Sequence, residues 1–197
     1  MATAAAAAVL PPNAYASHAS GRWAMRLLIV TEASFFAYLL FSYFYLGSMA
    51  STWPPSGPPS LRIAGPDTVI LLSSSATLWW AEQAIKRGAQ SQLRAGLLIT
   101  FVLGAVFLGL QAVEWSQKAF TPQTSAYGSL YFTVTGFHGA HVVAGLLMNL
   151  VVQFWAWRGF FSARRHELVS NAALYWHFVD AVWIAVFTSL YLIPRLA

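Results

Sequence analysis

The sequence predicts an all-α, polytopic membrane protein built as a bundle of five transmembrane helices. Of its 197 residues, 58 % are apolar and only 9 % are charged, whereas soluble domains carry roughly 25 % charged residues. Five apolar segments are long enough to cross ~30 Å of hydrocarbon at ~1.5 Å per residue. These segments cover about residues 24–46, 68–86, 93–115, 128–156 and 171–193.

Residues 1–21 precede the first span. They lack a positively charged start, and prolines interrupt them at positions 11 and 12, so we expect a mobile cytoplasmic tail and not a cleaved signal peptide. Residues 22–197 then form a single five-helix domain. Between the first two spans, residues 47–66 are rich in proline and glycine, a composition that favours a loop.

Aromatic residues fall at the predicted span ends, as expected for a membrane interface. These are Trp53, Trp115, Tyr127, Trp155, Trp157 and Tyr191. Small residues recur every fourth position, a spacing that lets helices approach closely in lipid. Two such stripes are Gly96, Thr100, Gly104 and Gly136, Ala140, Ala144. Either stripe could also be simple space-filling.

The basic residues indicate the orientation. Eight of them lie on the side of the amino terminus, namely Arg22, Arg26, Lys86, Arg87, Arg94, Arg158, Arg164 and Arg165. Arg62, Lys118 and Arg195 lie on the other side. By the positive-inside rule the amino terminus is cytoplasmic and the carboxyl terminus is outside. The net charge of +5 therefore reflects topology, and we expect no binding of nucleic acid.

Ionisable side chains occur where lipid is expected. Four of the six acidic residues and three of the five histidines lie in or at the ends of the spans. A charge at the bilayer centre costs at least ~2.5–3.5 kcal/mol, so each group should be paired, neutral or surrounded by protein. We expect Glu82 and Glu114 near span ends to be interfacial. The intramembrane hydrogen-bond candidates are His138, His141, His177, Asp180, Glu82 and Glu114.

Two short motifs resemble metal-ligand spacing: His138 with His141, and His177 with Asp180. Neither forms a closed ligand set, so we predict no bound metal and expect hydrogen bonds to neighbouring helices instead. The absence of cysteine excludes disulfides and thiolate metal sites. Glu32 lies ~12 Å into the first span. It is either a functional protonatable carboxyl or a hydrogen-bond partner within the bundle.

Several motifs in one order resemble subunit III of the haem-copper terminal oxidases. They are "LLIVTEASFFAYLLFSYFYL" at 27–46, "WPP" at 53–55, "LQAVEW" at 110–115, "SAYGSLYF" at 125–132, "TGFHGAHVVAG" at 135–145 and "YWHFVDAVWIAVFTSLYLI" at 175–193. The resemblance covers about residues 22–197. Longer members have seven helices, and this chain resembles the compact five-helix bacterial form of the cytochrome c oxidase subunit 3 family. In the seven-helix form a cleft beside the first two helices holds phospholipid, so bound phospholipid is an open expectation here.

The resemblance implies a non-redox subunit of a proton-pumping oxidase that reduces O2 to water with electrons from cytochrome c, in the bacterial cytoplasmic membrane. Its expected partners are subunit I as the main contact, subunit II, small subunits and membrane lipids. Haem and copper would lie in those partner subunits, with no cofactor bound by this chain. The resemblance makes Glu32 the carboxyl that reacts with hydrophobic carbodiimides. It also implies support of assembly, proton uptake and turnover stability of subunit I.

Three other interpretations stay open at this point. The chain could be subunit III of a quinol oxidase, which is built similarly. It could be a small proton-coupled transporter, in which Glu32, His141, His177 and Asp180 would form a relay. Inverted repeats with broken helices, which many transporters show, are not visible. It could finally be a structural scaffold in which Glu32 has no titrating role.

Overall fold

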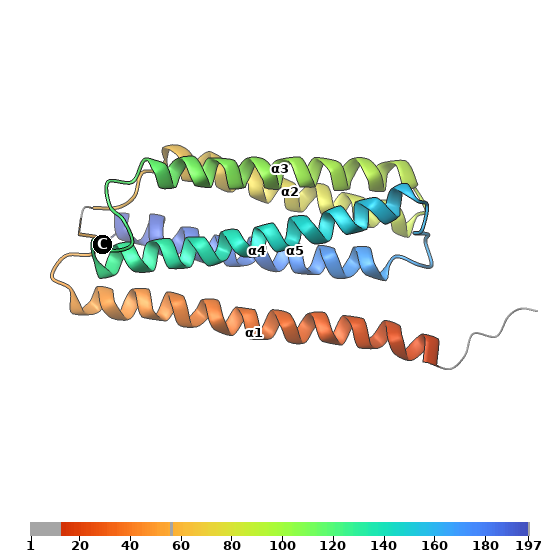
Figure 1. The fold of residues 1–197 in the computed structure, drawn as a ribbon, viewed down its shortest axis with the longest axis horizontal. Coiled ribbons are helices and arrows are strands. Elements are labelled where there is room, and N and C mark those ends of the chain that lie inside the picture. Colours follow the sequence, from red (N-terminus) through yellow and green to blue (C-terminus); the bar gives the residue numbers. More distant parts are fainter. Residues whose placement is uncertain (1–12, 56, 197) are drawn as a thin grey trace, which may run out of the picture.

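The computed structural model describes residues 13–55 and 57–196, and in this part of the chain the long elements are all helices. They are α1 (Asn13–Met49), α2 (Leu61–Lys86), α3 (Gln90–Ser116), α4 (Ala126–Trp157) and α5 (Glu167–Phe187). A π-helical turn, Thr188–Leu192, and a 3-10 turn, Ile193–Arg195, continue α5. The helices run side by side along one long axis (Figure 1). The predicted all-α bundle of five helices is confirmed.

The bundle has two chemically different ends. We call one the proline-rich end: it holds the α1–α2 loop, the α3–α4 loop and the carboxyl terminus (Figure 1). We call the other the basic end: it holds the α2–α3 turn and the α4–α5 loop.

Four helices of the described chain are long and apolar enough to cross a membrane. They are α1 from Gly21 onward, α3, α4, and α5 with its continuation to Arg195. The remaining helix, α2, has 26 residues and is therefore ~39 Å long, but its serines, threonines and acids lower its hydropathy. Several of these polar side chains are buried against neighbouring helices, including Asp67 and Ser74. Helix α2 thus depends on surrounding protein more than the other four do.

Helix α1 begins at Asn13, eight residues before residue 21, where the expected tail ends. Residues 13–21 of the expected tail are therefore helical, while residues 1–12 lie outside the described part. The 37 residues of α1 extend ~55 Å, more than the ~30 Å of hydrocarbon. The first turns can thus continue into the interface, where the alanines of this segment favour a helix.

Helix α2 also starts earlier than predicted, at Leu61, although residues 47–66 read as a loop. Ser60 caps it, with its Oγ accepting a hydrogen bond from the Arg62 N–H at 3.2 Å. Pro66 lies inside the helix but only in its second turn, where a missing N–H removes a single early hydrogen bond. The cap outweighs the helix-breaking composition that the sequence suggested.

The glycine stripe on α3 is a true helix contact. A Cβ placed on Gly96 would lie 2.7 Å from the Ala81 Cβ and 3.0 Å from the Thr77 carbonyl oxygen of α2. Thr100 continues the contact, with its Oγ1 2.8 Å from the Thr77 Oγ1. Gly104 lies against the Trp176 ring of α5, at 2.7 Å from an added Cβ. These close approaches explain why small residues occupy this face.

The second stripe, on α4, makes no close helix contact at Gly136 or Ala140, although Ala144 packs against the core. Nothing comes closer than 3.9 Å to a Cβ built on Gly136, and Ala140 is exposed. The glycine of α4 that admits a neighbour is Gly145, whose added Cβ would lie 2.7 Å from the Trp176 ring. The small residue that admits a neighbouring helix is therefore Gly145, one position after Ala144 of the predicted stripe. It must be small because the large Trp176 side chain packs against it.

Helix α1 lies at one side of the bundle and packs mainly on α4 and α5 (Figure 1). Near the proline-rich end Trp53 fixes it, with ring centroids 5.3 Å from Tyr43 and 5.2 Å from Tyr127. Large apolar side chains, among them Val30 and Phe41, are exposed on its outer face. This face is therefore available to lipid or to a partner subunit.

Candidate functional site

The centre of α1 and the centre of α4 each supply one ionisable side chain to a single pair. The His141 Nε2 lies 3.0 Å from the Glu32 Oε2, and the His141 Nδ1 lies 2.7 Å from the Phe137 carbonyl oxygen. Glu32 is eleven residues from Gly21, the start of the apolar stretch of α1, and is thus ~17 Å along it. The pair therefore lies deep in the membrane-spanning part of the bundle.

The geometry restricts where protons reside on this pair. A carbonyl oxygen only accepts, so the His141 Nδ1 carries a hydrogen and donates it to Phe137. The Nε2 then either accepts from a protonated Glu32 or donates to its carboxylate. Both arrangements hold one shared proton and have zero net charge, which keeps the cost of placing the pair in hydrocarbon low. Removing that proton would leave the negatively charged Glu32 carboxylate facing the lone pair of the His141 Nε2.

Aromatic side chains surround the pair on the protein side. Phe36 meets the His141 ring edge-to-face at 5.0 Å between centroids, and the Tyr175 hydroxyl donates to the His141 carbonyl at 3.4 Å. On the outer side, the Glu32 side chain remains 30 % exposed and that of His141 16 %. The pair is thus held by α1, α4 and α5 but stays accessible from the bundle surface.

His138 has a different environment from His141, although only one helical turn separates them. It is 1 % exposed and packs between the rings of Phe107 and Trp183, at centroid distances of 5.7 and 4.9 Å. Neither ring nitrogen has a hydrogen-bond partner among the described residues, so the predicted hydrogen bond is not observed. His138 serves as a flat aromatic packing group, and the two histidines do not converge on one site.

His177 and Asp180 share a face of α5 that points toward α2. The His177 Nδ1 lies 2.6 Å from the Ser75 Oγ. Asp180 is buried, and neither carboxyl oxygen has a hydrogen-bond partner within the described residues. The four-residue relay expected of a transporter is therefore not assembled: Glu32 pairs with His141, while His177 bonds to a serine of another helix.

Glu82 and Glu114 lie at opposite ends of the bundle. At the basic end, Glu82 pairs with Lys86 at 2.9 Å and accepts from the Ser170 hydroxyl at 2.8 Å. At the proline-rich end, the Glu114 Oε1 lies 2.7 Å from the Lys118 Nζ. It also accepts from the hydroxyls of two tyrosines, Tyr131 at 3.1 Å and Tyr191 at 2.8 Å.

The sequence analysis missed Asp67, which is fully buried on α2 with no hydrogen-bond partner in the described chain. The predicted span began at residue 68, so Asp67 fell in the loop that Gly65 and Pro66 suggested. Its neighbour Thr68 accepts a hydrogen bond from the Trp183 indole at 2.9 Å. The only available signal was the aspartate directly before an apolar run, which is also a common helix cap.

No group of three or more His, Cys, Asp or Glu side chains in residues 13–55 and 57–196 could hold a metal ion. In these residues several ionisable side chains of the membrane-spanning helices instead form hydrogen-bonded pairs, such as Glu32 with His141 and Ser75 with His177.

With this geometry in view, the comparison with known proteins is decisive. A family model described as "Cytochrome c oxidase subunit III" matches residues 8–194. The chain belongs to the cytochrome c oxidase subunit III family. It is 38 % identical over 179 residues to "Cytochrome c oxidase subunit 3" of Marchantia polymorpha, covering 86 % of this chain and 67 % of that protein. With the same-named protein of Thermostichus vulcanus it shares 37 % identity over 172 residues, covering 86 % and 85 %.

Membership in this subunit III family makes the chain a multi-pass membrane component of a haem-copper oxidase. Its relatives belong to an oxidoreductase complex, so the chain works together with other oxidase subunits. The resemblance found in the sequence motifs is thereby confirmed over almost the whole chain.

Proposed function

We propose that this subunit III supports proton uptake and turnover stability of a proton-pumping oxidase without carrying out redox chemistry itself. The observation that carries the proposal is the Glu32–His141 pair, with 3.0 Å between the Glu32 Oε2 and the His141 Nε2. The two groups share a proton deep in the membrane, and their outer edge stays exposed. A proton held at such a place can pass to water or to a neighbouring subunit.

The partner that receives this support is subunit I, which we propose as the main contact, with subunit II and small subunits completing the complex. Haem and copper reside in those partners, and cytochrome c is the electron donor. We propose that assembly of the complex also depends on this chain, through exposed apolar faces such as that of α1.

We propose that the amino terminus is cytoplasmic and the carboxyl terminus is outside, with the complex in a bacterial inner membrane. The folded arrangement supports this orientation, because the α2–α3 turn and the α4–α5 loop lie at the same end of the bundle. Eight basic residues therefore gather there, and three remain at the opposite end. Such an imbalance retains the basic end on the cytoplasmic side during insertion.

The proposal is tested by purifying the native complex through an affinity tag on this chain. We expect haem absorption bands, a subunit I and a copper-containing subunit II, with oxygen consumption driven by reduced cytochrome c. A complex that lacks copper in subunit II and oxidises quinol would assign the chain to the quinol branch. Recovery of the chain alone, without haem, would contradict the oxidase assignment of this protein.

The role of Glu32 is tested by labelling the same complex with a hydrophobic carbodiimide, which modifies protonated carboxyls. We expect one modified carboxyl in this chain, at Glu32, and no modification after Glu32→Gln. Labelling of His141→Phe should rise or persist, because the carboxyl then needs its own proton to remain neutral. The Ser34→Ala variant is a matched control, because the Ser34 hydroxyl only bonds to the Val30 carbonyl on the same helix. Absence of label at Glu32 in the wild-type complex would contradict a protonated site.

A further inference from the structure

A group of buried polar side chains lies between α2 and α3 at the proline-rich end of the bundle. Its members are Asp67 of α2 and Gln111 and Glu114 of α3, which are 0 %, 2 % and 4 % exposed. Gln111 and Glu114 are about one helical turn apart on the buried face of α3. Asp67 is close enough to Glu114 for two carboxylates at these positions to repel each other. We call these three side chains the polar cluster.

Most polar atoms of the polar cluster lack a hydrogen-bond partner among the described residues. They are both carboxyl oxygens of Asp67, both amide atoms of Gln111 and the Oε2 of Glu114. An unpaired polar atom in a protein interior is costly, and native structures satisfy such atoms with buried water or by protonation. The Gln111 amide offers both a donor and an acceptor to a carboxyl group. The polar cluster therefore has the composition of a site for water and protons.

The charges around the polar cluster do not balance two carboxylates. Within the described residues, the cation in contact with it is Lys118, whose Nζ lies 2.7 Å from the Glu114 Oε1. The hydroxyls of Tyr131 of α4 and Tyr191, which follows α5, donate to the same oxygen at 3.1 and 2.8 Å. One ammonium beside two carboxylates would leave one uncompensated negative charge in the interior, which is costly. One proton on the carboxyls removes that charge.

Two arginines at the same end of the bundle do not supply the missing positive charge. The Arg195 guanidinium donates hydrogen bonds to the carbonyl oxygens of Pro59 and Tyr191. Arg62 is exposed, and within the described chain it makes no ion pair. Neutralisation of the second carboxyl is therefore left to a proton.

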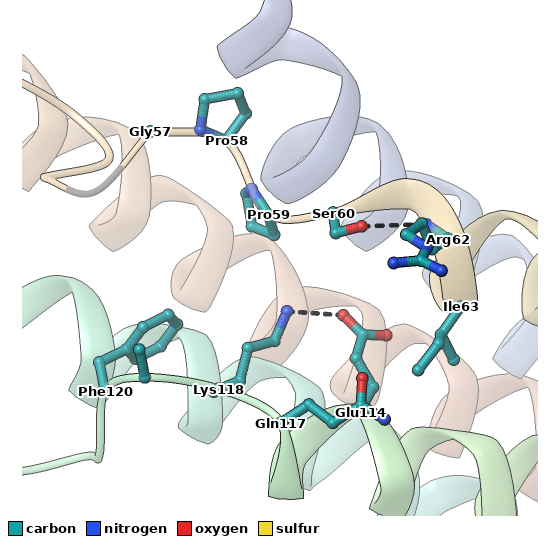
Figure 2. Close-up of a pocket in the computed structure, with 11 residues that line it drawn as sticks. Gly57, Pro58, Pro59, Ser60, Arg62, Ile63, Glu114, Gln117, Lys118 and Phe120 are labelled. Carbon is teal, nitrogen blue, oxygen red and sulfur yellow. Dashed lines mark hydrogen bonds and ion pairs between the residues drawn. The ribbon is translucent and has the colours of Figure 1, made fainter.

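A pocket of about 670 Å³ lies beside the polar cluster, between the loop that leads into α2 and the end of α3. Figure 2 shows the ion pair of Lys118 and Glu114 at one side of this pocket, with Pro59 and Arg62 at the other. The charged side chains of the lining favour water in the pocket, which brings the aqueous phase next to Glu114. Glu114 thus links this water to the fully buried Asp67.

We propose that Asp67 and Glu114 form a second proton-holding site of this subunit, in which the two carboxyls share one proton and exchange it with water in the pocket. On uptake, an O–H bond of a protonated water in the pocket breaks, and a new O–H bond forms on a carboxyl oxygen. The Lys118 ammonium holds Glu114 at the edge of the pocket. The site is independent of the proposed role of Glu32, because none of its hydrogen bonds or ion pairs involves Glu32 or His141.

The test is infrared difference spectroscopy of the intact oxidase complex, because a protonated carboxyl has a C=O stretch that a carboxylate lacks. Subtracting the spectrum of Asp67→Asn from that of the wild type at neutral pH should show one protonated carboxyl per chain. The remaining Glu114 then ionises beside Lys118, so the variant keeps no protonated carboxyl at this site. A hydrophobic carbodiimide does not report on this site, because Asp67 is fully buried.

The same band should shift to lower frequency in D2O, since the shared proton exchanges with water in the pocket. Glu167→Gln is the control, because its carboxylate pairs with the Arg22 guanidinium at 3.4 Å at the basic end, so no protonated-carboxyl band should change. Equal protonated-carboxyl bands in the wild type and Asp67→Asn would overturn the proposal, and so would a band that D2O leaves unshifted.

Lys118→Met decides the matter if Asp67→Asn fails to assemble. Methionine retains an apolar stem but lacks the ammonium, so both carboxyls must then be neutral and the protonated-carboxyl band should double. Arg62→Gln is the matched control at the same pocket, because Arg62 is exposed and lies outside the ion pair, so the band should keep its wild-type size. An unchanged band in Lys118→Met, or an equal increase in both variants, would overturn the proposal.

Discussion

The contact between α2 and α3 predicts a measurable cost for a single methyl group. In Gly96→Ala the new Cβ would meet the Ala81 Cβ at 2.7 Å and the Thr77 carbonyl oxygen at 3.0 Å. Both lie below ordinary van der Waals contact, and the second neighbour is backbone, which cannot rotate away. Overpacking of this kind costs about 1–3 kcal/mol, while replacing glycine by alanine in a helix returns about 0.5–1 kcal/mol. The net destabilisation should be about 0–2.5 kcal/mol.

Gly109→Ala is the matched control on the same helix. Gly109 is exposed, and a Cβ there meets nothing within 4 Å, so this variant should only gain helix propensity. The difference in unfolding free energy between the two variants then isolates the overpacking of about 1–3 kcal/mol. For a chain of this length we expect a difference of about 2–4 °C in midpoint per kcal/mol.

The assay is the thermal midpoint at which this subunit unfolds in the purified complex, followed by loss of helical circular dichroism or by protease sensitivity. The double variant Gly96→Ala with Ala81→Gly should recover part of the lost stability, because it removes the closest contact while the Thr77 carbonyl remains. If Gly96→Ala and Gly109→Ala unfolded at the same temperature, the close approach of α2 and α3 would be incorrect.

Three further outcomes follow from the geometry. Cysteines placed at Ser51 and Ser162 should differ in intact cells: an impermeant thiol reagent should label only the Ser51 position, and the reverse pattern would invert the proposed topology. Elemental analysis of the isolated subunit should find no stoichiometric transition metal, and one tightly held zinc or copper per chain would contradict this. Thr68→Val should lower stability by about 1–3 kcal/mol, because the buried Trp183 indole N–H loses its acceptor; an unchanged midpoint would show that another acceptor replaces it.

The sequence predicts the bundle well because each apolar run must cover the full hydrocarbon thickness. The sequence-based prediction differs from the structure where helix capping sets the start of a helix or where contacts between helices set the packed face. Helix α2 starts at Leu61, within residues whose composition suggests a loop, because Ser60 caps it. The Gly96 stripe was predicted as a contact, whereas Gly145 was not, because only the position of Trp176 shows which face of α4 must be small.

The candidate site could be predicted only in part. Glu32 and His141 were each selected as ionisable residues in apolar spans, but their pairing across 109 positions of sequence depends on how α1 lies against α4. His138 belongs to the same short motif as His141. Its position on α4, three residues earlier, directs its ring toward α3 and α5, where it packs between two aromatic rings. Asp67 escaped detection because a proline and a glycine before it resemble a loop.

The most direct test of the account is the turnover lifetime of the assembled oxidase in which Glu32 is replaced by alanine. Glu32→Ala should leave the haem spectrum and the initial rate of oxygen consumption nearly intact, because no redox centre is touched. During sustained turnover the variant should lose activity severalfold sooner than the wild type and the Ser34→Ala control, most clearly at high pH where protons are scarce. A complex that assembles normally and keeps a wild-type lifetime across pH would contradict the proton-supply role, and so would failure of Glu32→Ala to assemble.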